Sequence, residues 1–135
     1  MTDNQIEFAG LKVMVIDDSK TIRRSAETLL TKAGCQVITA ENGFEALPLI
    51  TEHHPDIMFI DIMMPRLDGY QTCSLVKSNP NFSATPIVML SSKDGIFDRA
   101  KGRVVGAEEY LTKPFTREDL LSAIRAHLPD KNMST

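Results

Sequence analysis

The stretch that most constrains the fold is Pro55-Asp-Ile-Met-Phe-Ile-Asp61, which is followed by Ile62-Met-Met-Pro-Arg-Leu-Asp-Gly69. Its four consecutive apolar residues are typical of a strand that is buried on both faces in a parallel sheet. Asp61 comes where this strand ends, and ligands of open α/β sheets bind outside the carboxyl ends of the strands. Asp61 is therefore a candidate for chemistry, although the stretch alone leaves open that it only caps the next segment.

Composition argues against several functional classes. The net charge is −3 over 135 residues, so no basic excess points to direct nucleic-acid binding. The length predicts one domain, and no apolar run approaches the roughly 18 residues of a membrane span. The N-terminal segment is polar and acidic, unlike a secretory signal, so we expect a cytoplasmic protein without membrane insertion. Cys35 and Cys73 lie among apolar neighbours, which predicts reduced core thiols.

Strand-like apolar runs alternate with helix-like stripes along the chain. Strands are predicted over residues 12–16, 36–40, 57–60, 86–90 and 109–111. Helices are predicted over about 20–33, 42–53, 70–78, 95–105 and 116–128. This alternation predicts a single doubly wound α/β domain with a five-stranded parallel sheet, as in flavodoxin-like folds. We expect the domain to span residues 11–128, between a flexible N-terminal tail at 1–10 and a C-terminal tail at 129–135.

Local signals mark the ends of several helices. Gly34 follows the first helical stripe and is suited to a left-handed cap. Asn42 with Glu45 three residues later resembles a capping box, and Thr116 is a candidate N-cap for the last helix. Pro48 falls inside the second helix, beyond its first turn, where it removes one backbone donor. We expect that helix to persist with a kink.

Polar side chains follow the predicted strands at their carboxyl ends. Strand one ends in Asp17 and Asp18, strand three in Asp61, strand four in Ser91 and strand five in Lys113. In a parallel sheet these ends meet at one edge, where one pair of carboxylates about 4 Å apart repels by roughly 4 kcal/mol. One lysine offsets only part of this repulsion. The remaining charge predicts a divalent cation or a protonated acid, unless the acids are only solvated caps.

These residue types fit phosphoryl transfer. Asp61 is a candidate nucleophile, because aspartate can form an acyl phosphate. Oxygen ligands suit Mg²⁺, which Asp18 and Asp61 would hold against the phosphoryl oxygens. Lys113 would supply a positive charge, and the Ser91 hydroxyl a hydrogen bond, to the same oxygens. Ser91 and Lys113 are weak signals alone, but as members of one set at successive strand ends they are strong.

Four segments carry a resemblance to a known family. They are Val15-Ile-Asp-Asp-Ser19, Asp61-Ile-Met-Met-Pro-Arg-Leu-Asp-Gly69, Met89-Leu-Ser-Ser92 and Tyr110-Leu-Thr-Lys-Pro-Phe115. Over about residues 11–128 the sequence resembles the receiver domains of two-component response regulators, of the stand-alone CheY-like kind. The segments from Asp17 to Arg24 and from Leu67 to Thr72 most resemble the PilG-type regulators of type IV pilus twitching motility.

The resemblance implies a role for each site residue. Asp61 would be the phosphoacceptor. Asp17 and Asp18 would be the acidic pair around Mg²⁺, with Asp18 a direct ligand and Asp17 acting mostly through water. The backbone carbonyl of Met63 would be a further ligand. Lys113 would contact the phosphate, and the bond before its neighbouring proline is expected to be cis.

The resemblance also implies a switch and partners. Ser91 and Tyr110 match the switch pair, with the Tyr110 ring turning inward from an exposed position. The responding face would cover the fourth helix, the fifth strand and the fifth helix, with Arg99, Arg103, Tyr110 and Phe115 as its basic and aromatic residues. A chemotaxis-type histidine kinase would supply the phosphoryl group, and a protein of the motility machinery would be the target. We expect a monomer that is not an enzyme but promotes its own phosphorylation and dephosphorylation.

Three alternatives stay open. A haloacid dehalogenase-type phosphatase would place its nucleophile after strand one, with a second acid two residues later, whereas Asp17 and Asp18 are adjacent here. A flavodoxin-like cofactor binder would have a loop of Ser, Thr and Gly at that point. A phosphate sink would share the receiver chemistry but drain a kinase without an output partner.

Overall fold

The computed structural model describes residues 8–92 and 99–128. The strands are β1 Lys12–Ile16, β2 Gln36–Ala40, β3 Ile57–Asp61, β4 Ile87–Ser92 and β5 Glu109–Lys113. The helices are α2 Lys20–Lys32, α3 Gly43–His53, α4 Gly69–Ser78, α5 Arg99–Val105 and α6 Arg117–His127. The strands form one parallel sheet in the order β2-β1-β3-β4-β5. The predicted doubly wound α/β fold is confirmed.

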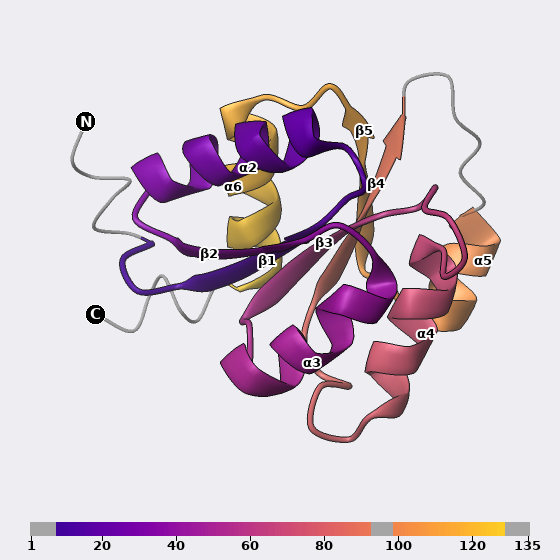
Figure 1. Cartoon of the computed structure of the whole chain (residues 1–135). Coiled ribbons are helices and arrows are strands. Elements are labelled where there is room, and N and C mark those ends of the chain that lie inside the picture. The colour runs from indigo at the N-terminus through magenta and orange to yellow at the C-terminus, as the bar shows by residue number, and fades with distance from the viewer. Residues whose placement is uncertain (1–7, 93–98, 129–135) are drawn as a thin grey trace.

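The sheet is covered by helices on both faces. Figure 1 shows α2 and α6 on one face and α3, α4 and α5 on the other. Side chains of β3 alternate between the two layers: Ile57 and Phe59 belong to the core under α2 and α6, while Met58 and Ile60 belong to the core under α3 and α4. All four side chains are buried. Burial on both faces explains why the first four residues of β3 are all apolar. Because β3 is the middle strand of the sheet, its carboxyl end lies at the centre of the sheet edge.

Capping fixes the helix starts next to the strand ends. The Ser19 hydroxyl accepts a hydrogen bond from the N–H of Ile22, which starts α2 directly after β1. Asn42 accepts one from the N–H of Glu45, as expected. The Glu45 carboxylate, however, returns to the N–H of Glu41 at 2.7 Å rather than to that of Asn42, so only half of the predicted capping box forms.

The remaining helix signals are mostly confirmed. α3 continues through Pro48, and its kink stays a prediction. Gly34 has φ +99°, the left-handed conformation expected after α2. Thr116 caps α6 in a capping box with Asp119. The predicted fourth helix is α5, which ends at Val105 and is followed by Gly106 with φ +96°, as expected. Its predicted start at 95–98 lies outside the described residues.

The expected start of the domain at residue 11 is wrong. Phe8 is only 1% exposed and belongs to the core between the sheet and α6. The Gly10 N–H donates to the Gly34 carbonyl, which joins this segment to the turn after α2. The folded part therefore includes Phe8–Gly10, and the rest of the predicted tails, at 1–7 and 129–135, lies outside the described residues.

Both cysteines are free and buried, as predicted. Burial raises the pKa of Cys35 to about 12 and the pKa of Cys73 to about 11, so both thiols are protonated at neutral pH. In the described part of the chain, no helix is long and apolar enough to cross a membrane.

Candidate functional site

Asp17 is the first residue after β1 and is fully buried. Its N–H donates to the carbonyl of Ala40 in β2, which holds it against the sheet edge. Its carboxylate accepts two hydrogen bonds, from the N–H of Ser19 to Oδ1 at 2.9 Å and from Lys113 Nζ to Oδ2 at 3.0 Å. Asp18 is exposed beside it. The adjacent acids therefore have different surroundings: Asp17 is buried in the protein and Asp18 is exposed to solvent.

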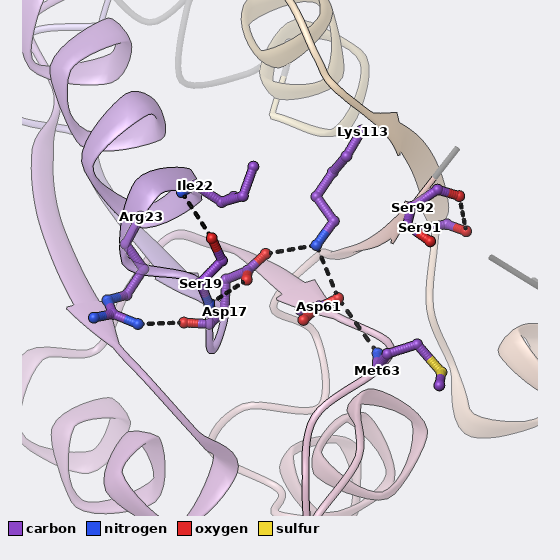
Figure 2. A network of polar contacts seen from close by, with 9 residues as sticks. All are labelled: Asp17, Ser19, Ile22, Arg23, Asp61, Met63, Ser91, Ser92 and Lys113. Carbon is purple, nitrogen blue, oxygen red and sulfur yellow. Dashed lines mark hydrogen bonds and ion pairs between the residues drawn. The ribbon is translucent and has the colours of Figure 1, made fainter. Parts of the chain in front are cut away.

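Asp61 is the last residue of β3 and is 2% exposed. Its Oδ1 accepts from Lys113 Nζ at 3.2 Å and from the N–H of Met63 at 3.3 Å. Figure 2 shows the Lys113 side chain reaching from β5 to a point between the two buried acids. The strand ends thus bring Asp17, Asp61 and Lys113 together, as the sequence predicted.

The loop after β3 is held close over Asp61 by Gly69. The Gly69 N–H donates to the carbonyl of Ile62 at 2.9 Å. A Cβ at this position would lie 2.3 Å from the backbone oxygen of Asp61 and 2.7 Å from Ile62 Cα. Asp68 then caps α4 in a capping box with Gln71. Only glycine allows the helix to begin this close to Asp61.

The site holds more negative than positive charge. Burial, with a further contribution from Asp17, raises the pKa of Asp61 to about 7, although Lys113 opposes the shift. Burial lowers the pKa of Lys113, but its contacts with Asp17 and Asp61 outweigh this and raise it above its usual value. Lys113 is thus fully charged at neutral pH, while Asp61 is poised between its two forms.

The donor set fits a hard divalent cation. One carboxylate oxygen from each of Asp17, Asp18 and Asp61 lies within 4.8 Å of the others. All three donors are oxygens, and the exposed Asp18 leaves one side open to water, which suits Mg²⁺. The pKa of Asp61 is raised mainly by burial and then by the charge of Asp17, and Lys113 only partly offsets these two effects. Two of the three acids are buried, unlike a cluster of surface acids.

Comparison with known proteins identifies the family. Residues 13–125 match the response regulator receiver domain. The chain belongs to the response regulator receiver family. It is 70% identical to Protein PilG of Pseudomonas aeruginosa over 120 residues, which cover 89% of each chain. It is 42% identical to the probable transcriptional regulator ycf27 of Porphyra purpurea over 117 residues, 87% of this chain but 47% of that longer protein.

Solved structures agree with this assignment. The chemotaxis protein CheY4 of Vibrio cholerae superposes with a TM-score of 0.84 and 34% identity, covering 89% of this chain and all of that one. A putative response regulator from Chloroflexus aurantiacus superposes with a TM-score of 0.83 and 32% identity, covering 89% of this chain and 98% of that one. The chain is thus a CheY-like receiver similar to PilG, as its motifs predicted.

Other expected features of the receiver are found in part. The Lys113–Pro114 bond is cis, as expected. Met63 contacts Asp61 through its N–H, and the role of its carbonyl stays a prediction. Ser91 is buried, and its hydroxyl donates to the Ser92 carbonyl at 3.3 Å (Figure 2). Among the described residues, the Ser91 hydroxyl has no hydrogen bond to Asp61.

The residues expected on the switching face differ in their burial and in the core that they contact. Tyr110 is half-buried against the core under α3 and α4, so its ring is less exposed than expected. Phe115 is half-buried against the opposite core, under α2 and α6. Arg103 is exposed on α5. Arg99 belongs to the same helix, but its side chain lies outside the described residues.

Sequence reasoning missed Arg23. Its Nη1 donates to the backbone carbonyl of Asp17 at 2.7 Å, and its Nη2 lies 3.9 Å from Glu41 Oε2. The contact depends on how the first turn of α2 folds back over the end of β1. One signal in the sequence could have indicated this contact: Arg23 is a cation in the first turn of a predicted helix, six residues after the strand-end acid Asp17.

Proposed function

We propose that this receiver accepts a phosphoryl group on Asp61 from a histidine kinase and passes the signal to a protein partner. The observation that carries this proposal is the position of Lys113 Nζ, between the buried carboxylates of Asp17 and Asp61, with an oxygen of the exposed Asp18 within 4.8 Å of an oxygen of each acid. The set matches a nucleophile, a positive charge for the incoming phosphoryl oxygens and an open cation site.

The hydrogen bonds at Asp61 favour one oxygen as the nucleophile. Within the described residues, both donors, Lys113 Nζ and the Met63 N–H, contact Oδ1. Oδ2 keeps its lone pairs for attack on phosphorus. The new O–P bond forms as the P–N bond to the kinase imidazole breaks, and the imidazole leaves with that electron pair. Lys113 then donates to the transferred group.

The metal site follows from the same residues. Asp18 and Asp61 would be direct ligands of Mg²⁺, the Met63 carbonyl a further ligand, and Asp17 a partner through water. Mg²⁺ would neutralise the charge on the phosphoryl oxygens during the transfer. Asp61 must be ionised to attack, and Lys113 favours that form by lowering a pKa that burial raises.

We further propose that phosphorylation changes the face formed by α5, β5 and α6. An open hollow of about 560 Å³ lies along β5 and is lined by residues that include Tyr110, Thr112 and Asp119. β5 is the edge strand of the sheet, and Ser91 in the neighbouring β4 links it to the site. The resemblance to the PilG-type regulators, with 70% identity to Protein PilG, supports a role in type IV pilus twitching motility. We propose that the regulator acts as a monomer in the cytoplasm.

The test is covalent labelling. Incubation with Mg²⁺ and acetyl phosphate should add one phosphoryl group by intact mass, and hydroxylamine should remove it. Asp61→Asn should take no label. Asp56→Asn is the matched control, because Asp56 lies just before the other end of β3, where it accepts the Lys12 N–H at 2.9 Å. Normal labelling of Asp61→Asn would overturn the assignment of the phosphoacceptor.

The alternatives give different results. A phosphatase would turn over small phosphoesters continuously, whereas a receiver takes one group per chain. A phosphate sink would be labelled but would retain no partner in its phosphorylated form. A pull-down that compares the phosphorylated and unphosphorylated chains separates signalling from the sink.

A further inference from the structure

Arg23 contacts the backbone at the acidic pair rather than a carboxylate of the pair. Its Nη1 lies 2.7 Å from the carbonyl oxygen of Asp17, and Figure 2 shows the guanidinium beside that carbonyl. The Arg23 side chain is only 17% exposed, so this contact is shielded from water. The backbone N–H of Arg23 donates to the Ser19 carbonyl, so Arg23 is part of the first turn of α2.

This contact completes the hydrogen bonding of Asp17. The Asp17 N–H donates to Ala40, and its two carboxylate oxygens accept from Ser19 and Lys113. The backbone carbonyl is its remaining polar group, and Arg23 is the donor to it. With every polar group of Asp17 engaged, the plane of the peptide between residues 17 and 18 is fixed.

That peptide plane sets the position of Asp18. Asp18 is exposed, and among the described residues its carboxylate has no hydrogen bond or ion pair to another side chain. Its carboxylate nevertheless lies close to those of Asp17 and Asp61, within the 4.8 Å that encloses one oxygen of each. The backbone is therefore what holds Asp18 at the site, and Arg23 holds that backbone.

We propose that Arg23 is a positioning residue for the divalent cation: it fixes the Asp17 carbonyl so that Asp18 is presented to the metal. The inference rests on the metal site in the proposed function. Partners that orient metal ligands without touching the metal typically contribute ten- to a hundredfold in affinity. Arg23 would act in this way through the peptide group.

The charge of Arg23 predicts the opposite effect. A cation this close to the three acids repels Mg²⁺, although Glu41, 3.9 Å from Nη2, offsets part of its field. If charge dominated, removing Arg23 would tighten Mg²⁺ binding. If position dominates, removing it weakens binding. The two effects differ in sign, so one measurement separates them.

The experiment titrates the full chain with Mg²⁺ alone, at constant ionic strength and without a phosphodonor, and follows the melting temperature. We expect Arg23→Ala to bind Mg²⁺ about tenfold more weakly than the wild type, with Arg23→Lys in between. Arg24→Ala is the matched control, because it removes the same charge from the next, exposed residue of α2 and should bind within about twofold of the wild type. Arg23→Gln replaces Arg23→Ala if the latter does not fold.

A second readout separates positioning from a general loss of structure. At saturating Mg²⁺, the labelling rate of Arg23→Ala should return to near the wild-type rate, because its ligands are intact and only their presentation is weakened. Mg²⁺ binding by Arg23→Ala or Arg23→Gln that equals or exceeds that of the wild type would overturn the inference alone. Absence of Mg²⁺ binding by the wild type would overturn the proposed metal site, and this inference with it.

Discussion

Lys113 Nζ lies 3.2 Å from Asp61 Oδ1, although 52 residues separate the two in the chain. The same ammonium lies 3.0 Å from Asp17 Oδ2. Both acids are almost fully buried, so water screens their repulsion only weakly. Two buried carboxylates share one positive charge, and the properties of the site follow from how the excess negative charge is balanced.

Protonation of Asp61 is one way to balance the excess negative charge of the site. Burial and Asp17 raise the pKa of Asp61 to about 7, from about 4 in an unfolded chain. Between these values the folded protein holds a proton that the unfolded chain has lost, so stability falls as pH rises through this window. Without Mg²⁺, Asp61→Asn should raise the free energy of unfolding by about 2–4 kcal/mol near pH 8 and change it little near pH 4.

Urea unfolding in EDTA at the two pH values measures this difference. Asp56→Asn, at the opposite end of β3, is the control and should show no gain that grows with pH. A stabilisation by Asp61→Asn that is equal at both pH values would mean that ionisation of Asp61 is not its cause.

Lys113 should matter for stability mainly because of the acids. Lys113→Met leaves Asp17 and Asp61 without their shared cation, which should cost about 2–4 kcal/mol at neutral pH. The cost should fall by at least about 1 kcal/mol in an Asp61→Asn background, where one charge is already gone. A double-mutant cycle by urea unfolding without Mg²⁺ tests this. Additive effects of the two substitutions would show that the 3.2 Å contact carries no coupling energy.

A divalent cation is the other way to balance the charge. At ten times its dissociation constant, Mg²⁺ should stabilise the wild type by about 1.4 kcal/mol, or about 4 °C in melting temperature. Asp18→Ala should lose most of this shift, while Glu27→Ala, which removes an exposed acid of α2, should keep it. A full shift in Asp18→Ala would place the metal elsewhere.

The convergence of Asp17, Asp61 and Lys113 was predictable because parallel strands carry their carboxyl ends to one edge. The sequence could not show which acid of the adjacent pair turns inward. That depends on the turn from β1 into α2, where the Ser19 N–H binds Asp17. The resemblance implied different roles for the two acids toward the metal, whereas the strand pattern alone did not separate Asp17 from Asp18.

The features that were missed depend on packing between distant segments. Phe8 lies in a polar stretch with no periodicity, and its burial requires α6, whose Arg125 guanidinium lies 5.6 Å from the Phe8 ring centroid. Phe115 was expected on the surface beside Tyr110, but the two rings pack on opposite faces of the sheet. A pattern along one segment does not report which of two cores a half-buried ring joins.

Gly69 should be needed for both stability and labelling. In Gly69→Ala the new Cβ would meet the backbone oxygen of Asp61 at 2.3 Å, so the loop or the end of β3 must move. We expect a loss of about 1–3 kcal/mol by urea unfolding, with slower labelling of Asp61 by acetyl phosphate. Gly10→Ala is a contrast, because its Cβ meets nothing within 4 Å and only its φ of +80° is strained. Labelling of Gly69→Ala at the wild-type rate would show that the loop accommodates the methyl group without disturbing Asp61.

The last prediction concerns how the signal leaves the site. The Ser91 hydroxyl donates to the Ser92 carbonyl at 3.3 Å, so it must give up this bond to reach a phosphoryl group on Asp61. Its hydrogen bond to a charged oxygen is worth roughly 1.5–3 kcal/mol, about tenfold or more in the equilibrium between the two states. Movement of Ser91 would free space beside β5, into which the half-buried ring of Tyr110 can turn further.

Ser91→Ala should therefore accept the phosphoryl group on Asp61 but bind its partner about tenfold more weakly, because the phosphorylated site no longer pulls β4 inward. Tyr110→Ala should also weaken binding and leave labelling intact. Ser92→Ala is the matched control, since Ser92 is exposed and contributes only its backbone carbonyl to the contact with Ser91. Labelling by intact mass, with a pull-down of each phosphorylated variant, measures both steps. If Ser91→Ala and Tyr110→Ala both kept full phosphorylation-dependent binding, the signal would leave the site by a route that does not use this pair.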